Sequence, residues 1–235
     1  MALLDDAITA SGGMDRWSKL KRFTLHLSID GSLLSRTGRP GHRELVAEGS
    51  TKTQSVRFTG LAGAETSATY QPDSVTIESL DGQVLRTWAS PALPIPDAAA
   101  TDWFADDLHL VFFCGLSIWN YVTTPFRLVH PDVETTELPL WNESGQAWRR
   151  LRATFPPDIA TLSREQIFYF DDKGLQRRTD YELFGMNVAH YSWAHQAFGN
   201  IMLPTLRRSL TLQDDGTVLP KPVLIDVEIF DATFE

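Results

Sequence analysis

Alternation of apolar and polar residues is the clearest pattern near the amino terminus. Between residues 23 and 29, four apolar positions (Phe23, Leu25, Leu27 and Ile29) alternate with polar residues. A period of two predicts a strand with one buried face. Asp30-Gly31 follows as a turn signal, and Asp81-Gly82 separates two further strand-like segments as a hairpin turn would.

Similar short segments recur along the rest of the chain. The first half contains candidates at 45–48, 55–59, 66–70, 74–79 and 84–88, and the second half at 147–155, 166–170, 175–183, 188–198, 202–212 and 223–229. Asp171-Asp172-Lys173-Gly174 forms a four-residue hairpin loop, and Asp215-Gly216 forms another turn. Ten or more short strands joined by turns predict an antiparallel barrel or strongly curved sheet.

Two segments have helical periodicity instead. Residues 2–11 predict a short helix, ended by Gly12 and Gly13, and one more turn follows at 14–20 with Trp17 facing inward. Residues 106–122 predict the one long helix, with Asp106 or Asp107 at its start and Pro125 after its end. This helix is apolar around most of its circumference, so we expect it to be buried inside the sheet or across its mouth.

These elements together predict a mainly β (α+β) fold. We expect a half-open, curved antiparallel β-barrel with one long buried helix and a short N-terminal helix, as a single domain over residues 1–235. Residues 90–103 contain three prolines and three successive alanines, so they predict a loop or cover segment rather than a strand. No internal repeat or linker interrupts the pattern.

Composition and charge narrow the possible partners. The 235 residues are 43% hydrophobic and carry a net charge of −9, which argues against a nucleic-acid partner because phosphate binding needs clustered cations. The longest apolar run, 108–122, is too short and too polar for a transmembrane segment. Asp5 and Asp6 interrupt the apolar start, so we expect no export signal and a cytoplasmic location. The single cysteine, Cys114, excludes an internal disulfide and lies in apolar surroundings typical of a buried residue.

Three blocks of sequence resemble an uncharacterised bacterial protein family of about this length. They are GGMDRWSKLKRFTLHLSIDG, DDLHLVFFCGLSIWNYVTTPF and WRRLRATFPPDIATLSREQIFYFDDKGLQRRTDYEL. The successive hairpins of the second half are also similar to the lipoprotein-carrier fold of LolA and its relatives. That resemblance implies a half-open antiparallel barrel whose concave apolar face is covered by helices and binds acyl chains. The resemblance implies a cavity in this protein but no particular function, and it assigns no catalytic residue.

Metal and nucleotide chemistry find little support in the sequence. His190 and His195 are five residues apart on a predicted strand, an odd spacing that places them on opposite faces. A zinc or iron site needs three convergent ligands, so we expect no metal and no other cofactor. The chain also lacks a G-x-S-x-G nucleophile motif and a Gly-rich phosphate loop.

Polar residues in apolar surroundings are the remaining candidates for chemistry. A neutral histidine in an apolar pocket serves as a general base, which makes His109, Tyr121 and His190 the candidate catalytic residues. Each also has a structural interpretation, in which a buried His or Tyr donates a hydrogen bond to the backbone. The candidate ligand-binding residues are mostly aromatic: Trp103, Phe112, Trp119, Tyr191, Trp193 and His195. Their alternative interpretation is packing in the core.

We therefore expect the protein to bind a small apolar or aromatic molecule in a cavity between the curved sheet and the buried helix. The alternative is an enzyme without metal or nucleotide, a lyase, isomerase, cyclase or hydrolase that uses His and Tyr as general acid and base. A third possibility is a structural or partner-binding module without a ligand. The sequence predicts neither the identity of the ligand nor the oligomeric state.

Overall fold

A computed structural model describes residues 2–35, 43–91 and 103–235. The amino-terminal half contributes six strands: β1 (Arg22–Asp30), β2 (Arg43–Ser50), β3 (Val56–Thr59), β4 (Thr66–Gln71), β5 (Ser74–Ser79) and β6 (Val84–Ala89). The other half contributes seven: β7 (Glu134–Glu143), β8 (Gln146–Thr154), β9 (Glu165–Phe170), β10 (Gln176–Leu183), β11 (Met186–Phe198), β12 (Ile201–Thr211) and β13 (Ile225–Phe234). Within these residues all 13 strands form one sheet.

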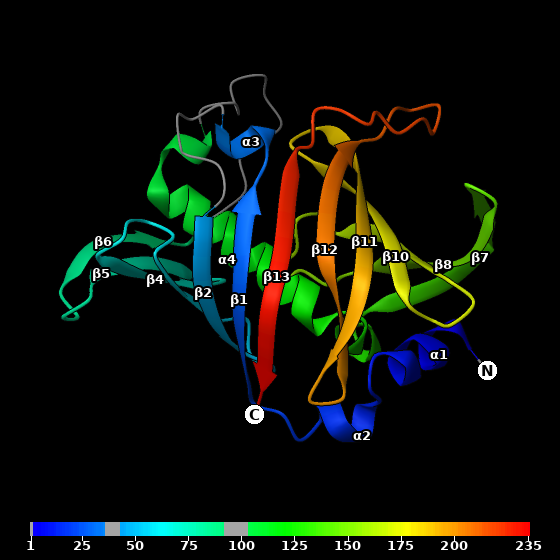
Figure 1. The fold of residues 1–235 in the computed structure, drawn as a ribbon, viewed down its shortest axis with the longest axis horizontal. Coiled ribbons are helices and arrows are strands. Elements are labelled where there is room, and N and C mark those ends of the chain that lie inside the picture. The colour runs from blue at the N-terminus through cyan, green and yellow to red at the C-terminus, as the bar shows by residue number, and fades with distance from the viewer. Residues whose placement is uncertain (1, 36–42, 92–102) are drawn as a thin grey trace.

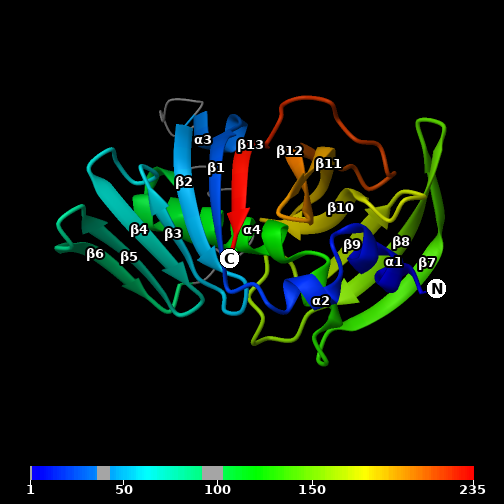
Figure 2. The same ribbon diagram turned by 60° about the horizontal axis from the view of Figure 1, so that its bottom comes forward.

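The strand order explains why the barrel stays open. It runs β6-β5-β4-β3-β2-β1-β13-β12-β11-β10-β9-β8-β7, so two antiparallel meanders are joined where β1 pairs with β13. The two edge strands, β6 and β7, do not pair with each other in the described part of the chain. Figure 2 shows the two halves of the sheet curving toward the viewer's left and right with a long helix between them. The predicted half-open, curved antiparallel barrel is therefore confirmed.

That helix, α4 (Asp107–Thr123), occupies the concave side of the sheet (Figures 1 and 2). The side chain of Asp106 caps its first turn by accepting a hydrogen bond of 2.8 Å from the backbone N–H of Leu108. Nearly all of its side chains are buried, as its apolar circumference predicts. Gly115 allows the helix to approach β4 closely, because a Cβ at this position would overlap the Cβ and Cγ atoms of Tyr70.

Shorter helices close the ends of the sheet. They are α1 (Leu3–Ala10), α2 (Met14–Trp17), α3 (Ser32–Ser35) and the 3-10 helix η2 (Phe126–Val129). Gly12 and Gly13 both have positive φ, at 116° and 82°, which confirms the predicted end of the N-terminal helix. Leu3 and Ala7 of α1 are buried in a second cluster of apolar side chains with residues of β8 and β9.

Two sequence-based interpretations need comment. The pattern predicted no strand for residues 134–143, yet β7 lies there as an edge strand with mostly exposed side chains. An edge strand buries little surface, so its sequence carries no strong apolar alternation. Most of the predicted cover segment, residues 92–102, lies outside the described residues. In the part of the chain that the structure describes, no helix is long and apolar enough to span a membrane.

Candidate functional site

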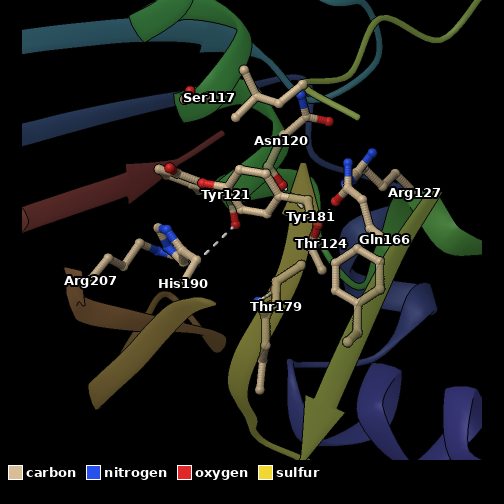
Figure 3. A pocket seen from close by; sticks show the side chains of 13 residues that line it. Ser117, Asn120, Tyr121, Thr124, Arg127, Gln166, Thr179, Tyr181, His190 and Arg207 are labelled. Atoms are coloured by element: carbon tan, nitrogen blue, oxygen red, sulfur yellow. Dashed lines mark hydrogen bonds between the residues drawn. The ribbon is translucent and has the colours of Figure 1, made fainter. Parts of the chain in front are cut away.

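A small cavity lies between the carboxyl-terminal half of α4 and strands β9 to β12 (Figure 3). Its volume is about 30 Å³. Helix α4 contributes Ser117, Asn120 and Tyr121, and the strands contribute mostly polar residues: Gln166, Phe168, Gln176, Thr179, Tyr181, His190 and Arg207. A cavity of this size holds about two water molecules, and its lining offers many polar partners.

Arg207 enters the cavity from β12 and is 2% exposed. Its guanidinium lies 4.6 Å from the ring centre of Tyr121 and donates a hydrogen bond of 3.3 Å to the backbone carbonyl of that residue. A further bond of 3.3 Å reaches the Ser192 hydroxyl. Burial lowers the pKa of Arg207 to about 10, so the group is still charged at neutral pH.

His190 is 1% exposed and is held on both sides of its ring. Its Nδ1 lies 2.8 Å from the Ser209 hydroxyl, and its Nε2 lies 3.5 Å from Arg207 Nη1. Burial and the neighbouring Arg207 cation lower the pKa of His190 well below its ordinary value, so the ring is neutral. A neutral Nε2 facing an arginine accepts a proton poorly, because protonation would place two cations side by side.

Two tyrosines stand next to this histidine. The Tyr121 and His190 ring centres are 4.7 Å apart, and those of Tyr181 and His190 are 6.3 Å apart. Burial raises the pKa of both phenols, so both keep their protons at neutral pH. The cavity therefore presents neutral hydrogen-bonding groups and cations rather than a ready base.

Arg127, from η2, is a second buried cation at this cavity and is 8% exposed. Its Nε donates to the Thr124 hydroxyl at 3.0 Å, and its Nη2 donates to Oε1 of Gln166 at 3.3 Å. Its guanidinium lies 4.1 Å from the ring centre of Phe155. Burial lowers the pKa of Arg127 to about 9. Among the described residues its Nη1 has no hydrogen-bond partner.

A larger, open groove lies next to this cavity and shares Arg127 with it. The groove has a volume of about 820 Å³. Trp119 of α4 contributes to its wall, together with Trp17 and Phe126, whose rings stack 4.3 Å apart. Residues of the 51–55 and 71–73 segments, most of them polar, form another part of its lining. Arg127 therefore lines both the open groove and the cavity.

The structure distributes the sequence-predicted residues over several places. Tyr121 and His190 line the cavity, and Trp119 lines the groove. His109, Trp103 and Phe112 instead form an aromatic cluster at the other end of α4. There, His109 stacks on Trp103 at 4.7 Å, and its Nδ1 lies 2.8 Å from the Trp103 carbonyl oxygen. This contact matches the structural interpretation of His109, since it connects the helix to the backbone of the residues that precede it.

Tyr191 and Trp193 lie on the opposite face of β11 from His190. Tyr191 donates a hydrogen bond of 2.6 Å to Glu143 and lies beside Arg178, which is ion-paired with Glu143 and Asp180. Trp193 stacks on Tyr191 at 5.5 Å. These residues therefore belong to an ion-pair network on the outer face of the sheet.

His195 does not line the cavity or the groove described above. Burial and the nearby cations of Arg177 and Arg207 lower the pKa of His195 to about 4. The ring is thus neutral at neutral pH, in a setting apart from the Tyr121–His190 pair.

Sequence reasoning missed the two buried arginines at this cavity, Arg127 and Arg207. A third buried arginine, Arg178, is bound to carboxylates on the outer face. The signal at Arg127 was its position between Phe126 and Leu128, both of which are buried. Arg207 lies on β12 between the partly buried Leu206 and the exposed Arg208, and its sequence context carried no comparable signal.

Among residues 2–35, 43–91 and 103–235, no group of three or more His, Cys, Asp or Glu side chains is placed to hold a metal ion.

The curved, open antiparallel sheet with a helix on its concave side is a LolA-like fold. Three solved structures share it: LolA superfamily protein NE2245 from Nitrosomonas europaea, a DUF1329 family protein from Desulfovibrio piger, and a putative outer membrane lipoprotein-sorting protein domain from Vibrio parahaemolyticus. Their TM-scores are 0.53, 0.55 and 0.56, at sequence identities of 9%, 12% and 8%. The alignments cover 99%, 100% and 99% of this chain and 92%, 92% and 91% of the other chains. No protein-family model and no curated protein matches the chain. At these identities the similarity establishes the fold and leaves the function open.

Proposed function

We propose that this protein binds a small apolar or aromatic molecule between α4 and the curved sheet, with the open groove as the entrance. The observation that carries the proposal is the pairing of a groove of about 820 Å³ with a polar cavity that shares Arg127. Small-molecule sites typically have volumes of roughly 300–1,000 Å³, apolar walls and a few convergent polar groups.

The walls of the groove favour an apolar or aromatic ligand. Trp119 presents an indole whose N–H is already bound to the Ser50 carbonyl at 2.9 Å, so its ring offers mainly apolar surface. The stacked rings of Trp17 and Phe126 line the same groove, with 6% and 3% of these residues exposed. Aromatic walls of this kind gain free energy by covering an apolar ligand.

The enzymatic alternative draws less support from the arrangement. His109 is bound to a backbone carbonyl, and both nitrogens of His190 already face polar neighbours. A general base needs a free acceptor within reach of the substrate proton. His190 offers no free acceptor in the cavity, and His109 lies outside both the cavity and the groove, so the geometry favours binding over proton transfer.

A neutral fluorescent probe, N-phenyl-1-naphthylamine, tests the proposal. Its emission should rise on addition of the protein, and Thr53→Trp should reduce this signal by filling the rim of the groove. Thr135→Trp, on the exposed edge strand β7, serves as the matched control and should bind as the unmodified protein does. A probe signal that is absent, or that Thr53→Trp leaves unchanged, would contradict the proposed groove.

Two further properties remain predictions. Fractionation of the native host, followed by detection of the chain, tests the cytoplasmic location.

Native mass spectrometry of protein purified from that host tests whether a small molecule stays bound. A retained mass with an apolar composition is the expected result, and its absence would favour a structural or partner-binding module.

A further inference from the structure

We infer that the ligand is an apolar molecule that carries a carboxylate, and that this carboxylate pairs with Arg127 while the apolar part lies in the groove. The inference rests on the proposed function and names the chemical class of the ligand. It is drawn from a buried cation that the described residues leave without an anionic partner.

The surroundings of Arg127 are those of an incomplete ion-binding site. More than nine-tenths of the residue is buried, yet its hydrogen bonds go to a hydroxyl and an amide oxygen and not to a carboxylate. Of the 13 residues that line the cavity, none is Asp or Glu. Asp73 and Asp158 line the groove, but both are exposed and neither is within ion-pair distance of Arg127.

Burying a cation without a counter-ion costs free energy, which an anionic ligand would offset. The contact of the guanidinium with Phe155 offsets part of this cost in the empty protein. Its Nη1 remains available among the described groups, and a charge-assisted bond to an oxygen anion is about twice as strong as a neutral one.

The size of the cavity favours a carboxylate over a bulkier anion. A volume of about 30 Å³ accommodates about two water-sized atoms, which matches the two oxygens of a carboxylate. A phosphodiester or sulfonate carries more oxygens and larger substituents. The adjoining groove then receives the apolar part of the ligand, along Trp119 and the Trp17–Phe126 pair.

Arg207 is a less suitable partner for this headgroup. Figure 3 shows it on the other side of Tyr121 and Tyr181 from Arg127, away from the residue that the cavity shares with the groove. It also lies against the Tyr121 ring and two further hydrogen-bond acceptors. Arg207 thus serves as an internal comparison for Arg127.

The experiment compares dodecanoate with dodecanol as competitors that displace N-phenyl-1-naphthylamine at pH 7.5. Dodecanoate should bind at least tenfold more tightly than dodecanol, since a hydrogen bond to a charged group contributes about that much. Arg127→Met should lower dodecanoate affinity about 10- to 100-fold and leave dodecanol affinity within about twofold. Arg152→Gln removes an exposed arginine of β8 and should change neither affinity.

The outcomes separate the carboxylate inference from the proposed binding of an apolar ligand. Equal affinity of dodecanoate and dodecanol for the unmodified protein would overturn the carboxylate inference and leave the apolar-ligand proposal standing. Failure of probe, alcohol and acid alike to bind would overturn both. Loss of the preference for dodecanoate in Arg207→Gln but not in Arg127→Met would overturn the assignment to Arg127.

Arg127→Lys, which keeps the charge without the planar group, provides a second variant in case Arg127→Met fails to fold. A reduced preference for dodecanoate in Arg127→Lys would support the role of the guanidinium. An unchanged preference would overturn it.

Discussion

At the scale of single residues, the concave side of this protein is unusual in its buried cations. Arg127 and Arg207 are both less than one-tenth exposed, and neither has an ion pair among the described residues. The outer face shows the usual arrangement instead, since Arg178 is equally buried but bound to Glu143 and Asp180. An isolated buried charge is costly, so residues of this kind indicate a role beyond stability.

His190 should make the stability of the protein depend on pH. Its pKa in the folded state lies well below the ordinary value of about 6.5, so the unfolded chain binds more protons than the folded one below that pH. Its contribution is thus present above about pH 6.5 and is lost as pH falls toward the folded pKa. We expect the urea midpoint to fall from pH 7.5 to 5, and to fall less in His190→Gln.

His26 provides the matched control for this experiment, because it is exposed on β1. His26→Gln should keep the pH dependence of the unmodified protein. His195, whose pKa is lowered to about 4, should leave part of the dependence in place when His190 is replaced. Identical slopes for His190→Gln and the unmodified protein would contradict the prediction.

His109 should matter for stability and not for ligand affinity. Its Nδ1 lies 2.8 Å from the Trp103 carbonyl oxygen, outside the cavity and the groove. His109→Ala should lower the free energy of unfolding by about 1–2 kcal/mol, through loss of this hydrogen bond and of the stacking contact. Probe binding by the folded protein, measured on the same sample, should be unchanged. A weaker probe signal would contradict this prediction and indicate that His109 contributes to ligand binding.

At the scale of elements, the close approach of α4 to β4 positions the whole site. The helix contacts the amino-terminal half of the sheet through Gly115, while its far end forms the wall of the cavity on the other half. The side chains of Phe112 and Tyr70 add an edge-to-face contact at 5.7 Å. Displacing the helix at Gly115 would therefore change the cavity as well as the core.

Gly115→Ala tests this arrangement. The added methyl group would overlap Tyr70, so the helix must shift and the free energy of unfolding should fall by about 1–3 kcal/mol. Thermal unfolding measures the loss. Thr9→Ala in the exposed part of α1 is the control and should stay within about 0.5 kcal/mol of the unmodified protein. A stable Gly115→Ala variant would contradict the close approach of α4 and β4.

At the scale of the whole molecule, the described strands form one continuous sheet, with the β1–β13 pair joining its two meanders. The largest apolar cluster includes α4 together with residues from both halves, such as Leu25 and Val227. The two halves therefore share a core, which supports the prediction of a single domain over residues 1–235.

A single domain should unfold in one cooperative transition. We expect differential scanning calorimetry to show one peak, with the calorimetric and van't Hoff enthalpies equal. The fluorescence of the tryptophans, which lie in both halves of the chain, should change at the same temperature as the far-ultraviolet circular dichroism. Two separated transitions would contradict the single-domain prediction.

The sequence by itself determined the elements whose environment is regular. Alternation along 23–29 predicted β1, and the apolar circumference of 106–122 predicted a buried α4, because burial acts on each residue locally and leaves a period in the sequence. Turn residues such as Asp81-Gly82 placed hairpins for the same local reason. The LolA-like architecture followed from these elements, whereas the exposed edge strand β7 left no such period.

Only the tertiary structure decided which side chains meet. Their apolar surroundings grouped His109 with Tyr121 and His190 in the sequence, but the length of α4 separates His109 from the other two. The fold brings Arg127 and Arg207 to one cavity from η2 and β12, which lie about 80 residues apart in the chain. No sequence pattern predicts that these two arginines line the same cavity. The physical reason is that a site consists of contacts between segments that are distant in the chain. Strand order and helix packing determine these contacts, and neither leaves a period in the local sequence.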